Sequence, residues 1–138
     1  MGVSRRILQP LGGVYCRRNI GFYFHTFVTT TSGTVSTTAG DTAAETGVTI
    51  AKTGSETGRY TITLPTPHRK LAAIIPTLIG ADDDAYGAVT VGLMAIVRDN
   101  DIASDGTVEV QFIGSNSGWA DAEIADGASV MLTIVVEG

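Results

Sequence analysis

The feature that most constrains this chain is a strict alternation of apolar and polar residues within short segments. Residues 59–64 (RYTITL) place Tyr60, Ile62 and Leu64 on one face, and residues 107–113 (TVEVQFI) repeat the pattern. Successive side chains of a β-strand point to opposite faces, so this two-residue spacing predicts strands that bury one face. Because no segment shows the 3.6-residue stripe of an amphipathic helix, the sequence predicts an all-β fold.

Turn-forming residues separate roughly seven or eight expected strands at spacings of about ten residues, which is typical of a sandwich, a jelly roll or a small barrel. The segments expected to form strands are 20–30, a hairpin over 47–64 with its turn at 54–58, 71–79, 88–98, 107–113 and 128–137. Residues 31–47 are rich in Thr, Ser, Gly and Ala and predict a loop or a weak edge strand. Pro76 indicates an edge, a bulge or a kink in its strand, with a helical turn as the alternative.

The chain is expected to form one domain. Residues 20–138 predict an antiparallel β-sandwich that is jelly-roll-like, and residues 1–19 predict an extended N-terminal arm, because Pro10, Gly12 and Gly13 oppose regular structure. Segments 22–27, 88–97 and 130–136 are apolar on both faces, which exceeds what one small interior needs. We therefore expect the last strand to be central in a sheet and the surplus apolar surface to be buried between subunits.

Charge is unevenly distributed along the chain. Residues 1–40 carry four arginines and no acid, whereas residues 80–138 carry eleven acidic residues against one basic residue, Arg98. A basic arm either docks on a negatively charged partner or keeps the terminus solvated. We expect docking, through basic and apolar side chains of the arm: Arg5, Arg6, Ile7, Leu8, Leu11, Arg17 and Arg18. The acidic body disfavours nucleic acid as a partner.

The sequence predicts neither a catalytic site nor a cofactor. Two histidines (His25 and His68) and one cysteine (Cys16) are too few and too dispersed for a zinc site. Loops 82–84 and 99–105 are rich in aspartate, but their spacing does not match an EF-hand, so we interpret them as solvated, with a structural cation as the alternative. The chain is expected to be a non-enzyme that binds no metal.

Aromatic residues are the best candidates for contacts with other subunits. Trp119 lies in a loop rich in Gly and Ser, where it either packs as an anchor or presents a stacking platform for a sugar or a base. The residues predicted to contact a partner or a second copy are Phe22, Phe24, Phe27 and Trp119.

No apolar run is long enough to span a membrane as a helix, and residues 7–16 are too short and interrupted for a signal segment. We expect a protein made in the cytosol and not processed.

Two motifs resemble a pattern found in virion proteins of tailed phages. Residues 57–64 fit TG-x-Y-x-[IV]-x-L, and residues 125–134 fit A-D-G-x-x-[VL]-x-[VL]-x-[IV], within a similarity that covers about residues 47–138. The family is that of capsid decoration (cement) proteins with a jelly-roll-like body. The resemblance implies a homotrimer on the outer surface of the capsid that binds the major capsid protein and stabilises the shell. The alternative function is a receptor- or glycan-binding head of a tail fibre, or another lectin-like module.

Overall fold

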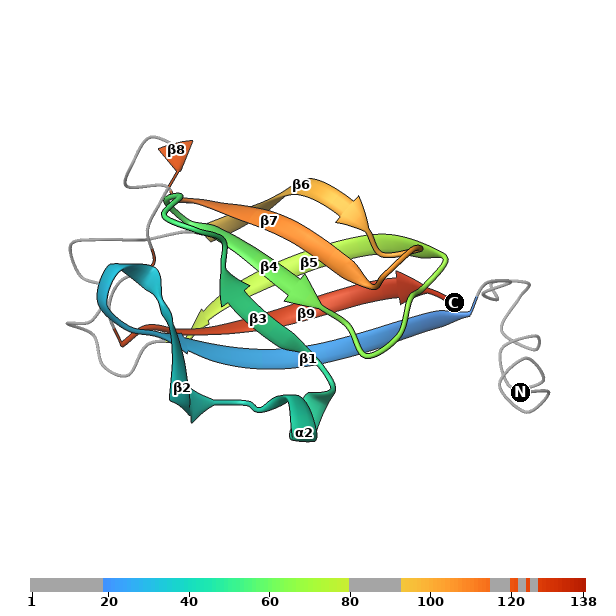
Figure 1. Ribbon diagram of the computed structural model, residues 1–138, viewed down its shortest axis with the longest axis horizontal. Coiled ribbons are helices and arrows are strands. Elements are labelled where there is room, and N and C mark those ends of the chain that lie inside the picture. Colours follow the sequence, from blue (N-terminus) through green and yellow to red (C-terminus); the bar gives the residue numbers. More distant parts are fainter. Residues whose placement is uncertain (1–18, 80–92, 115–119, 122–123, 125–126) are drawn as a thin grey trace, which may run out of the picture.

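Two antiparallel sheets packed face to face form the body of the protein (Figure 1). The computed structural model describes residues 19–79, 93–114, 120–121, 124 and 127–138. The first sheet has the strand order β2 (Val35–Gly40), β1 (Ile20–Thr29), β9 (Ser129–Glu137) and β5 (Lys70–Ile79). The second sheet has the order β3 (Thr49–Lys52), β4 (Arg59–Thr63), β7 (Thr107–Gly114) and β6 (Leu93–Asp101), with β8 (Ala120–Asp121) pairing with β7. The predicted all-β sandwich is confirmed.

Strands that are far apart in the sequence pair with each other. The terminal strands β1 and β9 pair in the first sheet, β4 pairs with β7 in the second, and β5 lies close to β6 where the margins of the two sheets meet. This order of pairing resembles the winding of a jelly roll. It also confirms the prediction that the last strand is central, because β9 lies between β1 and β5.

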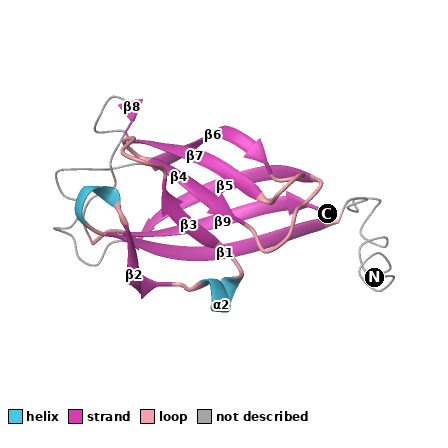
Figure 2. Ribbon diagram, in the orientation of Figure 1, coloured by secondary structure: helices cyan, strands magenta, loops and turns pink. Residues whose placement is uncertain are grey.

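Residues 31–47 contain more structure than their composition predicted. The weak edge strand is present as β2, but η1 (Thr31–Gly33) and α2 (Ala43–Thr46) flank it (Figure 2). In α2, the Glu45 carboxylate accepts the Thr42 N–H at 2.7 Å, which completes a capping box of the form T-x-x-E. Neither helix in the described part of the chain is long and apolar enough to cross a membrane.

Strand β5 confirms the edge position that Pro76 indicated. The Asn19 carbonyl accepts the Gly138 N–H, and the Ala128 carbonyl accepts the Thr29 N–H. The even-numbered residues of β9 therefore bond to β1, and its odd-numbered residues bond to β5. Pro76 lies opposite Leu132, so its nitrogen faces the outer edge of the sheet, where no donor is needed.

Strand β6 continues three residues beyond its predicted end at residue 98, with a bulge between Val97 and Asp99. The turn after it has Gly106 at φ 80°, a left-handed conformation that favours glycine. The Asp105 carboxylate accepts the N–H and the hydroxyl of Thr107 at 2.9 and 2.6 Å, and these bonds lower the pKa of Asp105. The Asp-Gly pair therefore sets the start of β7.

The core lies between the inner faces of the two sheets. Its centre is a cluster of three aromatic rings, Phe27, Tyr60 and Phe112, whose centroids lie 5.5–6.3 Å apart. Aliphatic side chains from β4, β7 and β9 surround the rings. Phe27 is 1% exposed, which corrects its prediction as a contact with a second subunit. Its odd position in β1 directs the ring inward, away from Phe22 and Phe24.

Candidate functional site

The outer face of the first sheet is apolar, and no other described element covers it. Strand register aligns its outward side chains in four rows across β1, β9 and β5. The rows are Phe22–Val135–Ala73, Phe24–Thr133–Ile75, Thr26–Met131–Thr77 and Val28–Ser129–Ile79. None of these twelve residues is charged, although the chain has 23 residues of Asp, Glu, Lys and Arg in total (14 + 9). We call these twelve residues the apolar face.

Two aromatic rings dominate the apolar face. Phe22 and Phe24 are 59% and 56% exposed, and their rings stack with centroids 6.4 Å apart and planes inclined by 6°. On the far strand, Ile75 is 52% exposed. A phenylalanine buries about 150–250 Å² when it is covered, so covering either ring would contribute about 2 kcal/mol. Exposed apolar patches are common at protein interfaces, so this face is a candidate contact surface.

Charged residues follow the apolar face at the end where β9 and β5 meet near the C-terminus. Lys70 on β5 and Glu137 on β9 are cross-strand neighbours, and Ile20 lies opposite Glu137 on β1. An apolar centre with a charged margin is the usual composition of a protein interface.

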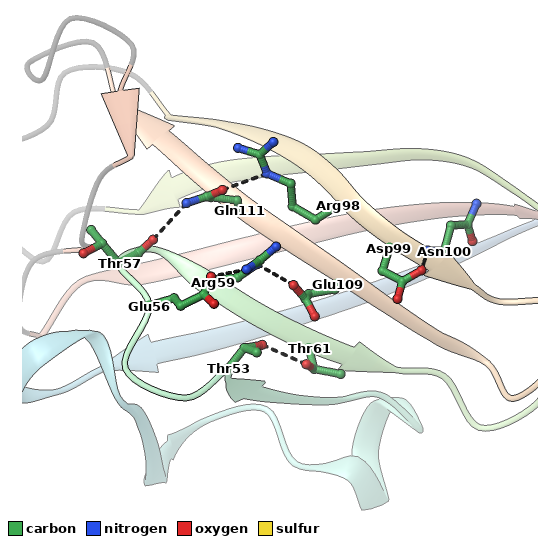
Figure 3. Close-up of polar contacts among 10 residues, drawn as sticks. All are labelled: Thr53, Glu56, Thr57, Arg59, Thr61, Arg98, Asp99, Asn100, Glu109 and Gln111. Atoms are coloured by element: carbon green, nitrogen blue, oxygen red, sulfur yellow. Dashed lines mark hydrogen bonds and ion pairs between the residues drawn. The ribbon is translucent and has the colours of Figure 1, made fainter.

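Across β4 and β7 the outer face of the second sheet is polar (Figure 3), whereas β6 exposes Met94 and Ile96 on the same side. Arg59 on β4 forms ion pairs with Glu56 and Glu109. Arg98 Nε donates to Gln111 Oε1 at 2.7 Å, and Gln111 Nε2 donates to the Thr57 carbonyl at 3.3 Å. These contacts pair most of the polar side chains of β4 and β7 within the chain, although Arg59 Nε makes an ion pair with Glu109 and no hydrogen bond.

The described acidic residues do not form a metal site. A small hollow of about 60 Å³ lies among Thr61, Asp99, Asp101, Thr107 and Glu109. Within the described ranges, no group of three or more His, Cys, Asp or Glu side chains is arranged to hold an ion. The aspartates at 82–84 lie outside the described residues.

A second candidate site is a cleft of about 350 Å³ between β2, α2 and β3. Hydroxyl groups from Ser36, Thr37 and Thr38 line it, together with His25 and Asp41. Thr26 N–H donates to Asp41 Oδ2 at 2.7 Å, and His25 Nδ1 bonds to Thr46 Oγ1 at 2.8 Å. His25 and Asp41 therefore hold local structure in place. Neither bond joins the two side chains to each other, as a catalytic nucleophile and its base would require.

The two histidines lie in separate environments. His25 is 3% exposed, and burial lowers its pKa, while the nearby carboxylates of Asp41 and Glu45 oppose that shift. His68 Nε2 bonds to the Tyr23 hydroxyl at 2.8 Å, and the two rings meet edge to face. His25 is therefore packed within β1, whereas His68 lies against an aromatic ring.

Of the residues predicted to make contacts, Phe22 and Phe24 lie together on the apolar face. Trp119 and the arm residues Arg5, Arg6, Ile7, Leu8, Leu11, Arg17 and Arg18 lie outside the described residues. The exposed Ile75 and Ile79 were not among the predicted contact residues. An apolar run such as residues 71–79 does not show which of its two faces another element covers.

No protein-family model, curated protein or solved structure matches this chain. The proposal for its function therefore depends on its own surfaces and on the motifs in its sequence.

Proposed function

We propose that the chain is a non-catalytic structural protein that packs against other protein subunits in a symmetric, repeating assembly. The observation that supports this most strongly is the apolar face, with twelve outward residues that carry no charge and two stacked phenylalanines on β1. An antiparallel sheet with one face in water normally carries polar side chains on that face. Apolar side chains on both faces therefore favour burial of the outer face in an interface.

More specifically, we propose a decoration protein that binds the outer surface of a tailed-phage capsid and stabilises the shell. Support comes from the motifs at residues 57–64 and 125–134; the first spans β4, and the described part of the second, residues 127–134, runs into β9. A protein in this position makes the same contact many times on one shell. Avidity between repeated copies then adds to a modest area of contact.

The test is co-sedimentation of the full-length protein with shells assembled from the major capsid protein of the same source. Two matched variants, Ile75→Lys on the apolar face and Ile96→Lys on the outer face of the second sheet, place the same charge on opposite sides of the sandwich. A lysine buried at an interface without a partner is strongly unfavourable. We expect Ile75→Lys to weaken shell binding by about tenfold or more and Ile96→Lys to leave it unchanged.

Wild-type protein that does not sediment with shells, or two variants that bind equally, would contradict this function. A glycan-binding head would instead bind carbohydrate through the loop of Trp119 and remain soluble in the presence of shells. Screening the same preparations against immobilised glycans separates the two functions.

A further inference from the structure

Over the first half of strand β1, the peptide groups along one edge have no partner among the described residues. Thr29 N–H donates to the Ala128 carbonyl at 3.0 Å, and the Asn19 carbonyl accepts the Gly138 N–H at 2.8 Å. In antiparallel pairing, alternate residues bond to the same neighbour, so the odd-numbered residues of β1 bond to β9. The N–H and C=O groups of Ile20, Phe22 and Phe24 therefore point away from β9.

Strand β2 does not cover these groups. Strand β2 pairs with β1 at Phe27 and Thr29, and Figure 1 shows β2 beside the end of β1 that lies far from the C-terminus. Both peptide groups of Thr26 are used by Asp41, which accepts the Thr26 N–H and donates its own N–H to the Thr26 carbonyl, each at 2.7 Å. Within the described residues, the open edge thus runs from Ile20 to Phe24 and ends at Thr26.

Other margins of the sheets carry features that prevent pairing. On β5, Pro76 removes a donor from the outer edge, and β6 lies close by. Strand β3 has only four residues, and the Thr46 hydroxyl takes the Val48 N–H at its start. The open edge of β1 has no proline, lysine, bulge or inward charge among its five residues. An unprotected edge beside exposed aromatic rings favours a strand partner.

We propose that the open edge pairs with the same edge of a second copy, antiparallel and across a twofold axis. In the register that places Phe22 opposite Phe22 of the second copy, Ile20 lies opposite Phe24, and each such pair exchanges two N–H···O=C bonds. The pairing is isologous, so one set of residues supplies both sides. The five paired residues contain no charge, so no like charges face each other.

The same register is sterically favourable on the inner face. It places Gly21, which has no side chain, opposite Tyr23 of the second copy. The axis is perpendicular to the sheet, so both apolar faces point the same way and join into one continuous surface. The pair presents twice the apolar area to a lattice, which would strengthen the binding proposed above.

The inference depends on the backbone of β1 and predicts a dimer, whereas the resemblance to decoration proteins implies a trimer. A chain that does not dimerise could still bind shells, and a dimer could fail to bind them, so the two proposals can fail separately. The first measurement is the solution mass of the full-length protein by light scattering. We expect about 29 kDa, twice the chain mass of 14.3 kDa; a monomeric or trimeric mass would overturn the inference.

Two variants at one position separate the backbone from the ring. Phe22→Ala removes the ring and keeps the N–H, while Phe22→Pro also removes the N–H, which faces the edge and has no partner in the described part of the chain. We expect the dissociation constant of Phe22→Pro to exceed that of Phe22→Ala by about tenfold or more. Ile75→Lys, on the far strand, should remain dimeric. Equal association of the two Phe22 variants would refute pairing through the backbone.

Hydrogen exchange of the wild-type protein gives a result that does not depend on a variant folding. The amides of Phe22 and Phe24 should exchange slowly in the dimer and become faster as dilution separates the copies. Slow exchange of these amides in a protein of monomeric mass would overturn the inference, because a segment of the same chain would then cover the edge.

Discussion

The two outer faces of the sandwich differ in how they satisfy their own side chains. On the second sheet, Arg59, Glu109 and Gln111 form a network within the chain. On the first sheet, the rings of Phe22 and Phe24 stack on each other and leave more than half of their area exposed. Both sheets contribute side chains to one core. The polar side chains of β4 and β7 thus find partners within the chain, whereas the two rings would lose exposed apolar area if another molecule covered them.

The largest expected effect tests whether the fold depends on the inner faces alone. Phe112→Ala empties the centre of the aromatic cluster and should lower the free energy of unfolding by about 3–5 kcal/mol. Phe24→Ala removes a ring that is 56% exposed, and it should change the same quantity by less than about 1 kcal/mol. Urea unfolding at low protein concentration measures both without a contribution from association. A large loss for Phe24→Ala would mean that the apolar face supports the fold of the single chain.

Much of this architecture could be predicted from the sequence because its signals are local. The alternation in residues 59–64 and 107–113 led to the correct strands, and the two-faced pattern of residues 130–136 correctly placed β9 at the centre of its sheet. The end of β6 was missed because Asp99 and Asp101 have polar side chains typical of turns, while pairing with β7 extends the strand through them.

The candidate site was less predictable, because a surface depends on which strands become neighbours. Phe22 and Phe24 were identified from their spacing, but Phe27 was grouped with them although its odd position turns it to the core. The contribution of Ile75 required knowing that β5 lies beside β9. The open edge of β1 follows from where β2 ends its pairing, and no residue type in residues 20–24 encodes that.

A smaller effect sharpens the contrast between the two faces. Arg59→Ala removes the ion pairs to Glu56 and Glu109, which are partly exposed, and should cost about 1 kcal/mol of stability. The loss should shrink at high salt, since screening weakens the original pairs. Ile75→Ser on the apolar face should show no such dependence on salt. Thermal unfolding of both variants at two ionic strengths checks this, and a salt-dependent loss in Ile75→Ser would blur the distinction between the faces.

The smallest effect is the dependence of stability on pH through His25. Burial lowers the pKa of His25 in the folded state below its usual value of about 6.5, so folding favours the neutral ring. The free energy of unfolding should therefore be greatest above pH 6.5 and decrease as the pH falls toward the folded pKa. Asp41 and Glu45 stabilise the protonated ring and keep this decrease small. Urea unfolding between pH 8 and pH 5 should show a flatter profile for His25→Gln than for the control His68→Gln. Equal slopes in the two variants would assign the pH dependence to other groups and leave His25 as a packing residue beside the hydroxyl of Thr46.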